Sequence, residues 1–368
     1  MEMENLMTDA AIVDAIFNGQ AHGSVAQRLL AGGMDIGPLR PYWDRGKAWV
    51  AVNERVNGEL VAVPKLVANA LLTYDEWKEI DRAVLEISKL RLRGTNDLVS
   101  RGLTFNIANG LGTTVLQWQT GSDTSDAQVD MAGESQGDRD RTTFAQNYLP
   151  LPIVHKAFSL NIRFLAMGRK MEQPIDTFEA TAAGRKVAEK IEDILFNGNS
   201  TYTFGGGTIY GYTDFPSRNT YTLGTQWTAS AATGAGILST VLGMVQASID
   251  DRHYGPWMLY VPTGYQTVLD EDYSTSYGET IRQRIMKIGG DNADQGIAGI
   301  GVSDYLTAHN IVLVEMTRET VEMVIGMQPT PVQWQEQGGM VEHHKIMAIM
   351  VPRLRADKDG RAGVIHAS

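Results

Sequence analysis

The feature that most constrains this chain is a helix with complete boundary signals that begins at Thr73. Thr73 and Glu76 have the spacing of a capping box, in which each side chain accepts a hydrogen bond from the other residue's backbone amide. Apolar residues recur on one face at helical spacing, namely Trp77, Ile80, Val84 and Ile87. Charges follow the helix dipole, with Asp75, Glu76 and Glu79 at the start and Lys89, Arg91 and Arg93 at the end. Gly94 comes next, and we expect it to cap the C-terminus of the helix.

Strand-like segments follow this helix and flank a long acidic arm. Three segments alternate apolar and polar side chains as strands do: residues 104–107, 116–118 and 158–163. Between the last two, residues 121–141 contain six acidic residues against two arginines, and Val129 and Met131 are their main large apolar side chains. Such a segment cannot bury enough surface to offset its own ordering entropy. We therefore expect the arm to be disordered or to be ordered by something outside it.

These motifs resemble a known family of shell proteins. Residues 73–81 (TYDEWKEID) and 90–94 (LRLRG) closely resemble the first helix of encapsulin shell proteins and of the related major capsid proteins of tailed phages. Three later segments resemble, in order, the return strand of the family's extended loop, its long spine helix and a short glycine-containing turn: residues 151–160, 181–198 and 211–216. The resemblance runs from Pro38 to the C-terminus. It implies the Hong Kong 97-type capsid fold, of the α+β class, and a structural role.

The resemblance also implies a division of the chain. Its parts are an N-terminal arm at residues 1–72, a first helix and connection at 73–103, an extended loop at 104–163, a peripheral domain with the spine helix at 164–230 and 331–368, and an axial domain at 231–330. Residues 1–72 supply no core large enough to fold alone, although a small subdomain packed on its own chain is the alternative. Ser24 and Gln27 are spaced to cap a short helix through Leu30. Residues 47–52 and 59–63 read as a hairpin around Asn57-Gly58.

Periodicity predicts the remaining elements. A long helix over residues 176–197, with a capping-box-like start at Asp176 and Glu179, carries one apolar stripe and is stopped by Gly198; the stripe consists of Val187, Ile191, Ile194 and Leu195. A helix over residues 236–249 is expected to turn four side chains inward: Leu238, Val241, Leu242 and Val245. Apolar runs that suit strands buried on both faces are residues 257–261, 311–314, 321–325 and 346–351. Short helical segments are expected at residues 265–269 and 280–288.

Composition excludes several classes of protein. No cysteine is present, so disulfides and thiolate metal sites are not available, and a cytosolic origin fits better than secretion. The net charge is −11 without a lysine- or arginine-rich run, which is unfavourable for gripping nucleic acid through its phosphates. No apolar run reaches the roughly 18 residues that a membrane span needs. Residues 1–5 are acidic, which argues against a signal peptide.

The candidate motifs for chemistry are weak. The glycines at 205–207 lead into strand-like sequence, whereas a phosphate loop needs a helix there. Adjacent His343 and His344 would point to opposite faces of a strand and so could not share one metal ion, which leaves a surface or interface pair as the better interpretation. Residues 270–272 and 250–251 are acidic clusters that read as solvated loop and helix end. We therefore predict no catalytic, metal-binding or cofactor-binding residues, and no enzymatic activity.

The candidate functional residues are instead contacts between subunits. We expect residues 105–119 and 144–163 to form an extended hairpin that lies across a neighbouring subunit. Six charged residues are candidates for holding it there: Asp138, Arg139, Asp140, Arg141, Lys156 and Arg163. Some capsids of this fold cross-link a loop lysine to a neighbour's asparagine. Residues 104–151 contain no lysine, which argues against such a bond in this chain.

The resemblance implies, first, a major capsid protein of a tailed phage or prophage. Many copies, as hexamers and pentamers, would build an icosahedral head around double-stranded DNA without specific DNA binding or membrane contact, with portal, scaffold or decoration proteins as further partners. The protein would be made in the bacterial host cytoplasm and reside in the virion capsid. The alternative is an encapsulin nanocompartment shell, which encloses a cargo enzyme. Residues 1–72 favour the phage, because encapsulins begin close to the capped helix. A soluble hydrolase acting through residues 270–272 is a third interpretation.

Overall fold

The computed structural model describes most of the chain beyond residue 40. It describes residues 41–44, 47–56, 59–66, 72–122, 129, 131, 141–161, 163, 178–274, 277–289, 296–307, 309–335, 341–357 and 359–368. The chain divides into two compact units. Unit 1 comprises Met1–Thr114, Leu151–Leu195 and Glu322–Pro352, and unit 2 comprises Val115–Pro150, Phe196–Val321 and Arg353–Ser368. Among the described residues, no helix is both long and apolar enough to cross a membrane.

Helix α3 of unit 1 (Tyr74–Arg91) starts as the sequence predicts. The Thr73 amide donates to Glu76 Oε2 at 2.8 Å and the Glu76 amide donates to Thr73 Oγ1 at 3.3 Å, which completes the capping box. The predicted apolar face is turned inward, and Trp77, Ile80 and Val84 are all buried. The predicted start and inward face of the helix are therefore confirmed.

The end of this helix differs from the prediction. Leu92, at φ −85° and ψ 64°, interrupts the helix, and α4 (Arg93–Ser100) begins immediately after it. Gly94 thus lies in the first turn of α4 and is not a C-cap, so that prediction is wrong. The reason is a distant carboxylate: the Gly94 amide donates to buried Glu192 Oε1 at 2.5 Å, and the Thr95 amide and hydroxyl donate to Glu192 Oε2. Glu192 therefore supplies a cap from another helix to the N-terminus of α4.

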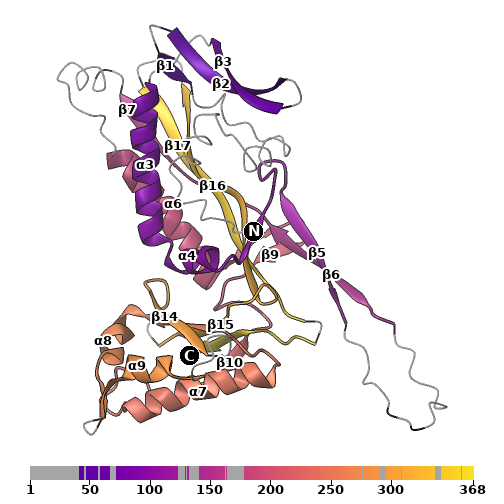
Figure 1. The fold of residues 1–368 in the computed structure, drawn as a ribbon, viewed down its shortest axis with the longest axis vertical. Helices are drawn as coiled ribbons and strands as arrows, with labels where there is room; N and C mark the ends of the chain where they lie inside the picture. Colours follow the sequence, from indigo (N-terminus) through magenta and orange to yellow (C-terminus); the bar gives the residue numbers. More distant parts are fainter. Residues whose placement is uncertain are drawn as a thin grey trace. The chain divides into compact units, whose positions relative to one another are not determined.

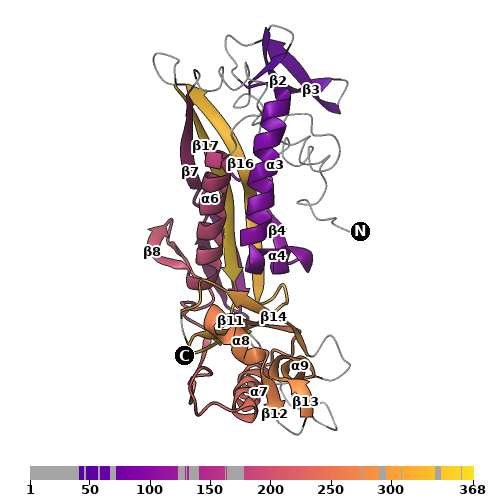
Figure 2. The ribbon, with the colours of Figure 1, turned by 90° about the vertical axis from the view of Figure 1, so that its left-hand side faces the viewer.

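A four-stranded sheet forms the centre of unit 1. Its order is β4 (Thr104–Asn106), β16 (Val321–Gln335), β17 (Val341–Leu354) and β7 (Val154–Asn161). The long helix α6 (Phe178–Asn197) runs beside α3 over one face of this sheet (Figures 1 and 2). Gly184 of α6 allows the close approach, because a Cβ there would lie 3.3 Å from Ile87 of α3. The predicted α6 stripe is buried: Val187, Ile191, Ile194 and Leu195.

A second sheet of unit 1 contains the predicted N-terminal hairpin. Strands β1 (Tyr42–Asp44), β2 (Lys47–Val56) and β3 (Glu59–Leu66) form an antiparallel sheet in that order. The two predicted strands are thus confirmed and are longer than expected. Three predictions fall wholly or partly outside the described residues. They are the turn at Asn57-Gly58, the helix predicted from Ser24, and the capping pair of Asp176 and Glu179.

Unit 2 is built on a five-stranded sheet that gathers distant parts of the sequence. Its order is β10 (Asn219–Tyr221), β18 (Val364–Ala367), β15 (Ile311–Glu315), β11 (Trp257–Pro262) and β14 (Ile297–Ser303). β11 runs antiparallel to β15 and parallel to β14. Every residue of β11 and β15 is buried, as their continuous apolar sequence predicts. Small elements beside this sheet are the 3-10 turn Thr263–Tyr265, α8 (Gln266–Leu269), β12 (Asp272–Ser274), β13 (Tyr277–Thr280) and α9 (Ile281–Met286).

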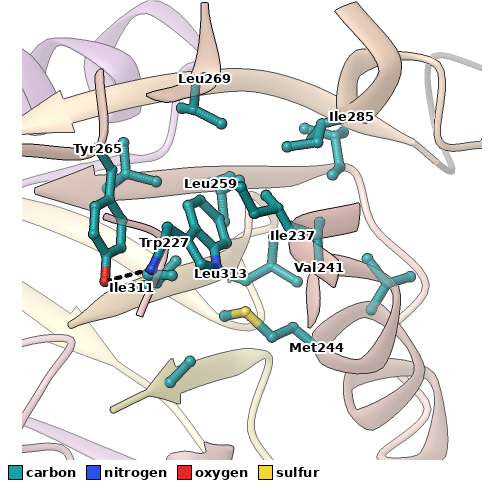
Figure 3. Close-up of a cluster of buried hydrophobic side chains, with 14 of the residues drawn as sticks. Trp227, Ile237, Val241, Met244, Leu259, Tyr265, Leu269, Ile285, Ile311 and Leu313 are labelled. Carbon is teal, nitrogen blue, oxygen red and sulfur yellow. Dashed lines mark hydrogen bonds between the residues drawn. The ribbon is translucent and has the colours of Figure 1, made fainter. Parts of the chain in front are cut away.

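Helix α7 (Gly234–Asp250) covers one face of this sheet (Figures 1 and 3). The core between them includes Val241 and Met244 of α7 together with Leu259 and Leu313 of the sheet. Leu242, which was expected to point inward, is 46% exposed. It follows Val241 directly and therefore lies about 100° further round the helix, outside the buried stripe. That expectation is wrong for Leu242 and confirmed for Val241 and Val245.

Two hairpins complete unit 2. Strands β5 (Val115–Gly121) and β6 (Phe144–Pro150) pair antiparallel over seven residues each. Strands β8 (Asn199–Phe204) and β9 (Gly207–Ile209) follow the end of α6. α6 stops at Gly198, whose φ is +68°, so the predicted stop is confirmed.

Candidate functional site

The glycines at 205–207 form a hairpin turn. Gly205 and Gly206 have φ values of +57° and +82°, which suits the tight turn between β8 and β9. Gly207 packs against the backbone of Tyr148 in β6, where a side chain would not fit. Strand β9 follows the glycines, whereas a phosphate loop leads into a helix N-terminus whose amides hold the phosphate.

The histidine pair is divided between the two faces of β17, as the alternation of a strand requires. His344 is fully buried between Phe158 and Trp77, with ring centroids 5.1 Å and 5.9 Å away. Its Nε2 lies 3.6 Å from a carboxylate oxygen of buried Glu342. The expectation of a surface or interface pair is wrong for His344, because this side chain fills the space beneath α3. His343 faces the other way and stacks on Trp334 at 5.5 Å.

The acidic clusters are engaged in ordinary surface contacts. Asp270 pairs with Arg282 at 2.7 Å, and Asp251 accepts a hydrogen bond from the Asn219 amide at 2.7 Å. Within the described ranges, no group of three or more histidine and carboxylate side chains is arranged to hold a metal ion.

A half-buried histidine–carboxylate pair in unit 2 was not predicted from the sequence. His253 Nδ1 lies 2.5 Å from Glu315 Oε2, and the carboxylate also accepts bonds from the Thr320 hydroxyl at 2.7 Å and the Gly255 amide at 3.1 Å. Burial lowers the pKa of His253, but the hydrogen bond and charge of Glu315 raise it more, so that it lies above its ordinary value. His253 and Glu315 are 62 residues apart, and no sequence pattern indicates that two such distant residues will pair. The cluster fastens the loop after α7 to the end of β15.

The extended hairpin is shorter than the sequence predicts. β5 and β6 pair from Val115 with Pro150 to Gly121 with Phe144. The flanking strands β4 and β7 were expected to continue this hairpin, but they pair with β16 and β17 and occupy opposite edges of the sheet in unit 1. This part of the prediction is wrong because long strands from the C-terminal part of the chain lie between β4 and β7.

The hairpin of β5 and β6 carries no charged side chain, and a contact near its base attaches it to the rest of unit 2. The 14 residues of β5 and β6 contain no charged side chain, and Phe144 is 68% exposed. Near the base, the guanidinium of buried Arg353 lies 5.7 Å from the ring centre of Trp118, which suits a cation–π contact. An exposed strand pair without charges has the composition of an interface core.

The six residues predicted as subunit contacts fall in different places. Arg141 is exposed before β6 in unit 2, whereas Lys156 and Arg163 are exposed in and after β7 in unit 1. Asp138, Arg139 and Asp140 lie outside the described residues. Their contacts with a neighbour stay a prediction.

A surface that sequence reasoning missed lies on the unit 1 sheet, on the side away from α3. Because His344 points toward α3, alternate residues of β17 point away from it, and β7 pairs with them in register. Five residues on this surface are Trp334, Val341, His343, Lys345 and His155. Lys345 Nζ lies 5.3 Å from the ring centre of Trp334. The residues of this surface are dispersed in the sequence. Only the alternation within β17 could have indicated that some of them share a face.

Comparison with known proteins finds a matching family model and a relative by sequence. The model of a family described as a family of unknown function (DUF6260) matches residues 67–367. A relative by sequence is the type 1 encapsulin shell protein EncA of Myxococcus xanthus (strain DK1622). It is 22% identical over 257 residues, which are 70% of this chain and 81% of that protein.

The fold is similar to solved structures of shells. The virus-like particle from Pyrococcus furiosus matches with a TM-score of 0.57 and 15% identity, over 79% of this chain and 98% of the other. The capsid of Myoviridae phage XM1 matches with a TM-score of 0.53 and 11% identity, over 73% of this chain and 90% of the other. The predicted α+β fold of the Hong Kong 97 type is therefore confirmed.

Proposed function

The chain belongs to the family of unknown function DUF6260, and we propose that it is a structural shell protein whose copies assemble into a closed icosahedral particle. The observation that carries this proposal is the extent of the fold likeness, which spans 98% of the virus-like particle chain. Heterologous contacts repeated by rotation close into shells, so one chain suffices to build a large container. The uncharged hairpin of β5 and β6 supports the proposal, because such a surface is suited to burial against another copy.

Of the two kinds of shell, we favour a nanocompartment of the encapsulin kind. The support is the sequence relationship to an encapsulin shell protein over 81% of that protein's length. This reverses the order of the two interpretations suggested by residues 1–72. The division into arm, extended loop, peripheral domain and axial domain belongs to the same proposal.

A phage head is the second candidate, and the likeness to the capsid of phage XM1 favours it. In that case the particle would contain double-stranded DNA, and portal, scaffold or decoration proteins would be its partners. The protein would then reside in the virion after synthesis in the host cytoplasm.

Light scattering after size-exclusion chromatography tests the shared part of the proposal. Purified protein is expected as megadalton particles or discrete rings, and negative-stain images should show closed shells. A stable monomer over a wide range of concentration and salt would contradict it. The contents separate the candidates: particles isolated from the natural source should hold a cargo protein if they are compartments, and long DNA if they are heads.

A further inference from the structure

The turn between β8 and β9 packs against the root of the β5–β6 hairpin, within unit 2 (Figure 1). We call this turn, residues 205–207, the glycine turn. A Cβ added at Gly207 would lie 2.7 Å from the carbonyl carbon of Tyr148 and 2.9 Å from Pro150 Cδ, whereas ordinary contacts begin at 3.4 Å. The glycine turn therefore approaches the backbone of β6 so closely that no larger side chain fits between them.

The other strand of the hairpin is held at the same end. Gly205 lies against the start of β5, because a Cβ added there would lie 2.6 Å from Val115 Cγ2. Three residues further along β5, the ring of Trp118 receives the cation–π contact of buried Arg353 at 5.7 Å. Phe144, at the far end of the strand pair, is 68% exposed. Contacts at the root therefore determine the direction in which the far end of the hairpin points.

The β8–β9 hairpin that carries the glycine turn is itself anchored at its stem. Gly198 precedes β8 and Gly211 follows β9, and a Cβ added at Gly198 would lie 2.5 Å from the Gly211 nitrogen. The Gly211 amide donates to Asp214 Oδ1 at 2.6 Å, and the Thr213 amide donates to the Phe196 carbonyl at 2.9 Å. Because its stem is fixed in this way, the glycine turn is a rigid support for the strands that it touches.

We propose that the glycine turn sets the direction of the β5–β6 hairpin and thereby selects the size of the closed particle. The inference rests on the proposed function, in which the uncharged hairpin is buried against another copy. The angle at which such a contact is made fixes the rotation from one copy to the next, and hence the number of copies that close into a shell. Every subunit repeats this angle, so a small change at the root of the hairpin acts throughout the particle.

Gly207→Ala tests the proposal, because the added methyl group would separate β9 from β6 at a position where alanine needs no positive φ. Electron microscopy should show particles of a different diameter or open assemblies, while the circular dichroism stays that of the natural protein. The matched control is Gly206→Ala. At a φ of +82° alanine strains the turn, but its Cβ would lie 3.9 Å from Tyr148 Cδ2, in ordinary contact. This control should keep the natural particle diameter.

The direction of the hairpin can be measured separately from particle size, because the sequence contains no cysteine that would compete for a label. Spin labels are placed at Gln119→Cys on β5 and Ser239→Cys on α7, which are exposed positions of unit 2. The labelled chain is diluted into an excess of unlabelled chain, so that the distances measured lie within one subunit. Gly207→Ala should shift the most populated distance. Gly224→Ala, whose Cβ meets nothing within 4 Å, should not shift it.

The outcomes are distinguishable from failure of the shell function. An unchanged distance in folded Gly207→Ala would overturn the role of the glycine turn, and a shifted distance with the natural particle diameter would overturn the link between direction and size. If Gly207→Ala does not fold, Val115→Ala decides, because it removes the methyl groups that Gly205 touches. It should broaden the distance distribution and give particles of more than one size, and unchanged distances or a single natural size would overturn the proposal. Absence of particles from the natural protein would instead contradict the shell function.

Discussion

The side chain of Trp77 stabilises helix α3 through buried contacts. It is 1% exposed, its Nε1 donates to the Pro41 carbonyl at 3.0 Å, and its ring meets His344. Trp77→Ala should therefore lower the free energy of unfolding by about 3–5 kcal/mol, as truncation of a core tryptophan does. Urea denaturation of the unassembled subunit measures this. Trp43→Ala, at a position 44% exposed, is the control and should change little; an equal effect of both would contradict the packing argument.

Glu192 gives unit 1 a pH dependence. Burial is the main cause that raises the pKa of this carboxyl to about 7, despite the hydrogen bonds from Gly94 and Thr95 that lower it. A carboxyl with a raised folded-state pKa binds its proton more tightly in the folded state, so stability falls as pH rises from about 4.5 to about 7. The loss is on the order of 3–4 kcal/mol, at roughly 1.4 kcal/mol per pKa unit.

Glu192→Gln should remove this dependence. Glutamine carries no charge and keeps one acceptor oxygen, while its amide nitrogen replaces the other oxygen that accepts from α4. The stability of the variant should therefore not change between pH 5 and pH 8. Urea unfolding at the two pH values measures the difference. Glu86→Gln, at an exposed position, is the control. A variant whose stability still falls between pH 5 and pH 8 as much as that of the natural protein would contradict this assignment.

Residue-level prediction from the sequence succeeded where the interaction is local. The Thr73 and Glu76 cap spans three residues, and α6 stops at a glycine with positive φ. It failed where partners are distant: Gly94 meets Glu192 across 98 positions, and His344 is buried by residues of other elements. A periodic pattern shows that one face of an element is apolar. It does not show which distant polar group will contact that element in the folded chain.

At the scale of elements, the acidic arm should matter for assembly and not for folding. Replacing residues 121–141 by a short Gly/Ser turn should leave the circular dichroism of the subunit unchanged and should weaken or abolish shells. The reason is that the arm has few apolar residues with which to stabilise its own subunit. Normal assembly with unchanged stability would show that the arm is only a solvated loop.

Hydrogen exchange provides a complementary measurement on the arm. Its amides should exchange quickly in unassembled subunits and should be protected in particles. The seven paired residues of β5 serve as an internal reference, because their ladder with β6 forms within one chain.

At the scale of elements, the prediction of the longer hairpin was wrong for the same reason, because the true partners of the strands are distant in the sequence. Strand alternation identified β4, β5 and β7 correctly, but it carries no information on pairing. The β7 residues match eight positions on β17 that lie almost two hundred residues later, and only the folded chain reveals that register.

For the whole molecule, the net charge of −11 predicts weak and non-specific contact with nucleic acid. Binding of free duplex DNA at physiological salt should be barely measurable, because the sequence has no lysine- or arginine-rich run to neutralise phosphates and release their counterions. Fluorescence anisotropy over a salt series tests this. Tight binding with a steep salt slope would contradict it. Particles enclosing DNA or cargo are both compatible with a weak interaction.

The strand order of unit 2 also determines when its sheet can be completed during translation. β18 lies between β10 and β15, so the sheet stays open in the middle until residue 367 has left the ribosome. Until then β15 has an unpaired edge of apolar sequence, which is a hazard for aggregation during translation. A subunit can therefore join its neighbours through unit 2 only after nearly all of this sequence has been made. Chains that are still being translated on the same messenger RNA cannot associate through a completed unit 2.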